Sequence, residues 1–104
     1  MAGLGKMMKH MARMQKKLAA LQEELALQEL TVSGGGGAVK VTVTLQSKIR
    51  SIQLDPEFLK EDVAMVEETL LSVVRDALDQ ATEKNEAAMA EVTQEFQMSG
   101  LPGF

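Results

Sequence analysis

Near the middle of the chain stands Val39-Lys40-Val41-Thr42-Val43-Thr44-Leu45, in which apolar and polar residues alternate over seven positions. A period of two places every second side chain on the same face of a strand. Valine and threonine are also β-branched, which favours strands. The stretch therefore predicts a β-strand whose valines are buried on one face.

The flanking segments complete a sheet. Leu30-Thr31-Val32 predicts a short strand, and the glycines at 34–37 can supply the positive φ angles of a hairpin loop. Lys48 to Leu54 predicts a third strand after a tight turn at Gln46-Ser47. Residues 30–54 are thus expected to form a three-stranded antiparallel sheet.

A long helix is predicted before the sheet, over residues 4–29. Its apolar residues recur at alternating spacings of three and four, which is the spacing of a coiled-coil seam; this heptad seam consists of Leu4, Met7, Met11, Met14, Leu18, Leu21 and Leu25. The cluster of Met7, Met8, Met11 and Met14 fits either a dimer core or an adaptable binding surface. Three of these four residues lie on the seam, which favours the dimer core.

A second long helix is predicted after the sheet. Asp55-Pro56-Glu57 is a helix-start signal, and helical periodicity extends from Val63 to Phe96, so residues 55–97 form a helical segment. Ser99-Gly100 followed by Pro102 ends it. The tail, residues 98–104, is expected to fray, unless Leu101 and Phe104 dock on a partner subunit.

The predicted fold is a single α+β domain, residues 1–104, whose helices are too long for a compact monomer. The first helix would be about 39 Å long, and the second, if unbroken from about 61 to 97, about 55 Å long, whereas a compact domain of this size is about 33 Å across. Two-fold dimerisation most simply covers the helices and the seam. The predicted dimer interface consists of Met7, Met11, Met14, Leu18, Leu21 and Leu25.

Charge is unevenly distributed along the chain. Residues 1–20 carry five Lys and Arg and no acid, while residues 21–104 carry six bases and fifteen acids, which gives +5 and −9 and a net charge of −4. On a helix the five cations fall within an arc of about 120°; this basic stripe consists of Lys6, Lys9, Arg13, Lys16 and Lys17. A solvated helix face is the simpler interpretation. However, cations near a helix N-terminus, without acids at i+4, cost stability, which favours a functional role in binding.

Several function classes are excluded or disfavoured by composition. With no Cys and one His, His10, the chain has no disulfide, thiolate or zinc chemistry. The adjacent carboxylate pairs diverge by about 100° on a helix and His10 has no orienting carboxylate nearby, so we expect no catalytic residues, no enzyme activity and no cofactor. No stretch fits a membrane span or signal peptide, so a cytoplasmic protein without membrane partners is expected.

Short motifs spread over the whole chain resemble one known family. They are Gly3-Leu4-Gly5-Lys6-Met7-Met8-Lys9, Met14-Gln15-Lys16, Glu23-Glu24, the glycine hairpin, Val39-Lys40-Val41-Thr42, Ile52 to Pro56, Glu67-Glu68-Leu70 and Leu101-Pro102-Gly103-Phe104. In this order they resemble the YbaB/EbfC family of nucleoid-associated proteins. One departure is the acidic stretch 82–96, where Glu83, Glu86, Glu91 and Glu95 outnumber Lys84.

This resemblance implies a bacterial cytoplasmic protein that is an intertwined homodimer and binds double-stranded DNA in chromosome organisation and gene regulation. Carried over by position, the DNA-binding residues are Lys6, Lys9, Arg13, Lys16 and Lys17. The resemblance also implies recombination-repair proteins as further partners. Two other functions stay open from the residues alone: a helical protein-interaction module that binds an acidic protein partner, and a less favoured membrane-surface helix.

Overall fold

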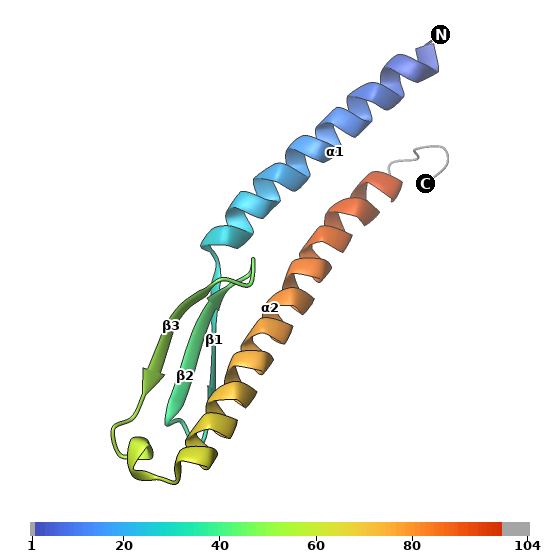
Figure 1. The fold of residues 1–104 in the computed structure, drawn as a ribbon. Coiled ribbons are helices and arrows are strands. Elements are labelled where there is room, and N and C mark those ends of the chain that lie inside the picture. Colours follow the sequence, from blue (N-terminus) through green and yellow to red (C-terminus); the bar gives the residue numbers. More distant parts are fainter. Residues whose placement is uncertain (1, 99–104) are drawn as a thin grey trace.

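A sheet and two long helices form the computed structural model, which describes residues 2–98 (Figure 1). In chain order, the elements are α1 (Ala2–Leu27), β1 (Glu29–Gly34), β2 (Val39–Thr44), β3 (Ile49–Leu54), the short 3-10 helix η1 (Phe58–Lys60) and α2 (Val63–Met98). The sheet is antiparallel with strand order β1-β2-β3. The predicted α+β fold and its order of elements are confirmed.

The core lies between the sheet and α2. Val39, Val41 and Val43 of the central strand are fully buried, as the alternation predicts. Helix α2 packs on β1 and β2, and its small residues Ala77 and Ala81 are fully buried there. Small side chains let the helix backbone approach the valines closely, so the central strand is buried without a large core.

The turn between β2 and β3 is built without glycine. Ser47 adopts a positive φ of 63°, a conformation that is uncommon for residues other than glycine. The buried Thr44 hydroxyl accepts hydrogen bonds from the backbone N–H groups of Gln46 and Lys48, both at 3.2 Å. These bonds hold the predicted turn at Gln46-Ser47 in place.

Helix α2 begins close to the predicted position. The Asp55 carboxylate accepts a hydrogen bond from the backbone N–H of Glu57 at 3.0 Å, and η1 follows. Val63, where the predicted helical periodicity begins, is 69% exposed, and Val66 is the first residue of α2 that packs against the core. The predicted helix stop at Ser99-Gly100 and the tail residues Leu101 and Phe104 lie outside the described residues.

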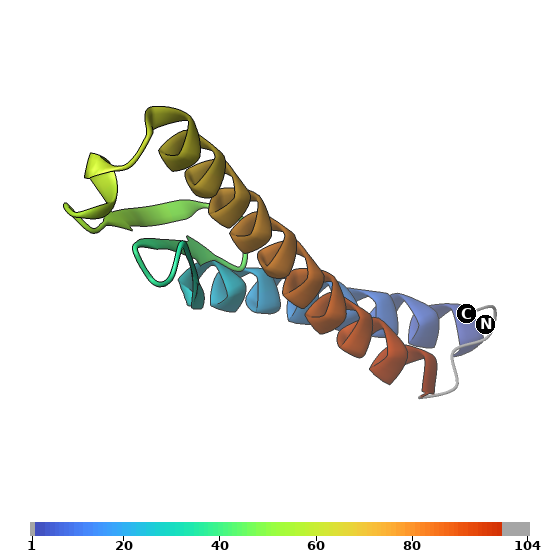
Figure 2. The same ribbon diagram turned by 90° about the horizontal axis from the view of Figure 1, so that it is seen from below.

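The chain is strongly elongated. Helix α2 extends past the sheet and lies antiparallel beside α1, so that both helices project from the same end of the sheet (Figures 1 and 2). The radius of gyration is 20.1 Å, compared with about 13 Å for a compact domain of this length. The expectation that the helices exceed a compact fold is confirmed.

Gly34, at the end of β1, gives a prediction about stability. A Cβ atom there would lie 2.5 Å from Cγ2 of Val73, a buried and stiff side chain. We therefore expect Gly34→Ala to lower the free energy of unfolding by about 1–3 kcal/mol, because of overpacking. Urea denaturation measures this change.

Gly5 is the control for this prediction. A Cβ atom at Gly5 meets nothing within 4 Å, and the residue lies within α1. Gly5→Ala is therefore expected to be neutral or to stabilise the protein, by up to about 1 kcal/mol. Equal stability of the Gly34→Ala variant and the unaltered protein would contradict the expected clash.

Candidate nucleic-acid interface

Most of the basic stripe is exposed on α1. The side chains of Lys6, Lys9, Arg13 and Lys16 are exposed, and within residues 2–98 none of them has an acidic partner. The first turn of α1 contains no acid either. We call these residues the free cations. Their charges are available to a polyanion without first breaking an ion pair.

Lys17 differs from the other members of the stripe. Its ammonium group donates to the Glu95 carboxylate of α2 at 2.5 Å, and the two side chains are 48% and 59% exposed. An exposed ion pair of this kind contributes about 0–1 kcal/mol to stability. The structure therefore places Lys17 against α2, and four of the five predicted DNA-binding residues remain free.

The heptad seam faces α2 over its C-terminal half. Leu25 is 2% exposed and belongs to the core of its own chain, and Leu21 packs against that core. Met14 and Leu18 are half-buried, whereas Met7 and Met11 are exposed. The C-terminal end of the seam thus packs within its own chain. A role of the seam in dimer contacts stays a prediction.

The two projecting helices carry opposite charges. Beside the basic α1, the last half of α2 exposes Glu83, Glu86, Glu91 and Glu95, with Lys84 as the exposed base among them. The free cations lie on the exposed side of α1, while Met14, Leu18 and Leu21 of the seam are half-buried. A polyanion therefore meets a favourable surface on the outer side of α1 and an unfavourable one along α2.

Strand β3 presents a second apolar surface, which the sequence reasoning did not include. The register pairs Val41 with Ile52 and Val43 with Ile49, so these isoleucines point to the side of the sheet that α2 covers. Helix α2 packs on β1 and β2, and Ile49 and Ile52 remain 46% and 45% exposed. Ile52 and Leu54 alternate with Gln53, but Ile49 reaches the same face only through the irregular register between Thr42 and Val43, for which the sequence carries no signal.

Other kinds of site find no support in the described part of the chain. Within residues 2–98, no three His, Cys, Asp or Glu side chains are grouped so that they could hold a metal ion. None of the helices in that range has an apolar stretch long enough to cross a membrane.

Comparison with known proteins identifies the family. A solved structure of an uncharacterized protein, HP0035, from Helicobacter pylori is 26% identical in sequence and superposes with a TM-score of 0.63. The match covers 77% of this chain and 93% of that one. The model of the YbaB/EbfC DNA-binding family matches residues 1–96, a range that includes the basic stripe, the sheet and nearly all of α2. The chain belongs to the YbaB/EbfC family of DNA-binding, nucleoid-associated proteins.

Proposed function

We propose that the protein is a homodimer that binds double-stranded DNA with little sequence specificity through α1, in chromosome organisation and gene regulation in the bacterial nucleoid. The observation that carries the proposal is the exposed face of free cations, Lys6, Lys9, Arg13 and Lys16. Lys and Arg that neutralise phosphates release condensed counterions, which supplies most of the affinity in sequence-independent binding. The proposed role is binding and not catalysis.

The chemistry of the free cations favours phosphate contacts over base recognition. Base edges are read through bidentate contacts, for which the planar groups of Arg, Asn and Gln are geometrically better suited than the ammonium group of Lys. This face offers one such residue, Arg13, beside three lysines, whose ammonium groups act as point charges. Contacts of this kind fix a protein on the duplex and carry little sequence information.

The exposed apolar side chains support the homodimer. Ile49 and Ile52 lie on one side of the sheet, next to the part of that side that α2 covers. A second copy could cover both residues, and symmetric association would then bring two arms to one duplex. Two linked arms bind far more tightly than one, since the second contact becomes intramolecular.

The experiment that tests the proposal is fluorescence anisotropy of a labelled duplex across a salt series. Eight free cations per dimer follow from four in each chain. If half to all of them reach phosphates, log K falls with log salt at a slope of roughly −4 to −7. Unrelated duplexes should compete about equally well. No salt-dependent retention on DNA, together with binding to an acidic protein, would instead support the protein-interaction function.

Lys16 and Lys17 provide a matched pair within this experiment. Lys16→Gln removes one free cation from each arm, so the slope of the dimer should become shallower by about 2. Lys17→Gln removes a cation that Glu95 already neutralises, and we expect the slope to change by less than about half a unit. Equal effects of the two substitutions would mean that Lys17 leaves Glu95 when DNA binds.

A further inference from the structure

The direction of α1 is set at its C-terminal end, which we call the root of the arm (residues 22–28). The first turns of α1 are exposed, Leu25 is the first fully buried residue, and Gln28 alone separates the helix from β1. The helix extends from Gln22 to Ala2 over about 30 Å at 1.5 Å per residue. Any small rotation at the root is therefore amplified where the free cations lie.

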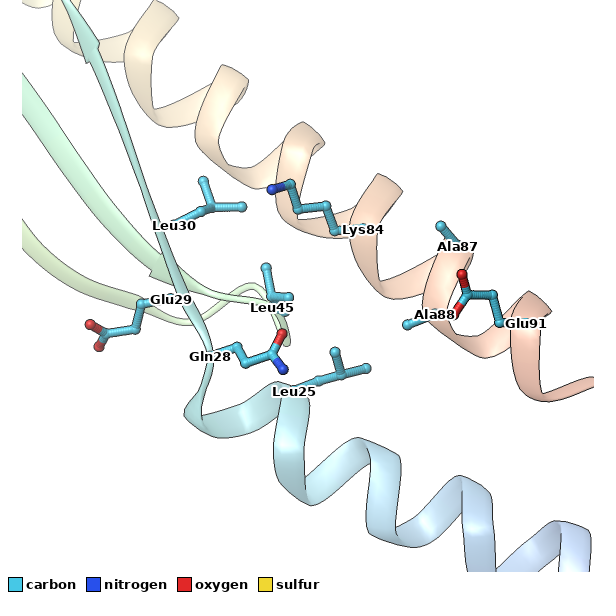
Figure 3. A pocket seen from close by; sticks show the side chains of 9 residues that line it. All are labelled: Leu25, Gln28, Glu29, Leu30, Leu45, Lys84, Ala87, Ala88 and Glu91. Carbon is cyan, nitrogen blue, oxygen red and sulfur yellow. The ribbon is translucent and has the colours of Figure 1, made fainter.

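Leu25 anchors the root in the core, but the space on one side of the root is not filled by apolar side chains. An open hollow of about 390 Å³ lies between the end of α1, the start of β1 and α2 (Figure 3). Leu25, Leu30 and Leu45 point toward α2 across it. On the opposite side, α2 lines the hollow with the small side chains of Ala87 and Ala88. The hollow is open to solvent, so on this side the space beside the root is not filled by side chains of α2.

Hydrogen bonds from the turn between β2 and β3 hold α1 at the root. The Gln46 side-chain amide donates to the backbone carbonyl of Gln22 at 2.8 Å and to its side-chain oxygen at 3.0 Å. The Gln22 amide in turn reaches the sulfur of Met89 in α2 at 3.0 Å. The backbone N–H of Leu45 donates to the Gln28 carbonyl at 3.0 Å.

The same turn is joined to α2. The Asn85 side chain donates to the carbonyl of Leu45 at 2.8 Å, and both Gln46 and Asn85 are half-buried, where a hydrogen bond is costly to lose. The turn itself is held by the buried Thr44 hydroxyl. Gln22, Gln46 and Asn85, which we call the polar clip, therefore tie both helices to one rigid turn.

We propose that the polar clip fixes the angle at which α1 projects, and that Gln46 and Asn85 are positioning residues for the DNA-binding arm. A rotation of about 10° at the root moves the far end of a 30 Å lever by about 5 Å, more than the rise of about 3.4 Å between successive phosphates along one strand. If the root is loosened, the free cations are therefore no longer aligned with the phosphates. This inference rests on the proposed function for its consequence in DNA binding.

The test compares Gln46→Ala and Asn85→Ala with the control Gln53→Ala, an exposed amide on β3 for which no side-chain hydrogen bond is present within residues 2–98. The chain has no cysteine, so spin labels can be attached at Met8→Cys in α1 and Ser51→Cys in β3, both exposed positions. Labelled chains are diluted into unlabelled ones, and electron paramagnetic resonance measures the distance within one chain. We expect the distance distribution to broaden by about 5 Å in both clip variants and to stay unchanged in the control.

DNA affinity of the same variants, without labels, gives the second readout. The clip variants should bind duplex DNA about 3–10-fold more weakly with the same salt slope, because every cation is retained. A shallower slope would overturn the positioning role, since it would indicate a lost phosphate contact. If Gln46→Ala does not fold, Asn85→Ala tests the proposal alone, because it removes the hydrogen bond to the Leu45 carbonyl and not those to Gln22.

The distance measurement also separates this inference from the proposed function. Unchanged distance distributions in the folded clip variants would refute the proposal that the polar clip fixes the angle of α1, even if DNA binding were weaker. Broadened distributions in a protein that does not bind DNA in any form would support the clip and refute the proposed function alone.

Discussion

Reversing Lys9, Arg13 and Lys16 to Glu together is expected to lower the affinity for duplex DNA by at least about 100-fold at moderate salt. Residues 1–20 would change from five bases and no acid to two bases and three acids, or from +5 to −1. The outer face of α1 would then repel phosphates along with the acidic α2. Fluorescence anisotropy with a labelled duplex measures the loss.

A second triple variant controls for net charge. Lys40, Lys48 and Lys84 are exposed and lie outside α1, so replacing them with Glu changes the total charge by the same amount. We expect this control to lose less than about 5-fold in affinity, because at 0.15 M salt exposed charges are screened over about 8 Å. Circular dichroism and light scattering confirm that both variants are folded and keep the same oligomeric state. Equal losses in the two variants would assign binding to overall charge, and no loss in the first would place the site elsewhere.

The sheet could be predicted from sequence because its signal is local. The alternation over 39–45 places Val39, Val41 and Val43 on one face whatever packs against it, and the structure buries all three. Of the glycines at 34–37 that were expected to adopt positive φ angles, Gly35, Gly36 and Gly37 do so, whereas Gly34 is the last residue of β1 and pairs with Val39. The positive φ of Ser47 could not be predicted from residue type. It accompanies hydrogen bonds that the backbone N–H groups on either side of Ser47 donate to the Thr44 hydroxyl.

The candidate site was only partly predictable. Helical periodicity shows which residues share a face of a helix, but it does not show which element packs against that face. The seam spacing correctly identifies one apolar stripe, but it cannot show that Leu25 packs in the core of its own chain. Likewise, Lys17 falls on the edge of the basic stripe nearest the seam, and its partner Glu95 lies 78 residues away in sequence. The polar clip joins three elements through side chains that carry no motif, so only the structure reveals it.

Ile52→Asp is expected to dissociate the proposed homodimer at micromolar concentration. In a single chain the position is 45% exposed, so the carboxylate stays hydrated and the fold is retained. Between two copies the same carboxylate would lose its water, and desolvating a charge costs several kcal/mol. Sedimentation velocity should show a species of 11.3 kDa in place of one twice as large.

Gln53→Asp is the matched control, because Gln53 is the next residue on β3 and pairs with Lys40 on the opposite, polar face of the sheet. It should leave the dimer intact. A dimer that persists in Ile52→Asp would place the interface on the exposed part of the seam, at Met7 and Met11, and not on β3.

DNA binding by the Ile52→Asp variant then separates loss of the dimer from loss of cations. Each monomer keeps its four free cations but brings one arm to the duplex, so the salt slope should fall to about half that of the dimer. The affinity should fall by more than about 100-fold, since the second arm is no longer held near the DNA at a high effective concentration. A monomer that kept the full slope would show that one arm makes all the phosphate contacts, and that the second copy contributes nothing to DNA binding.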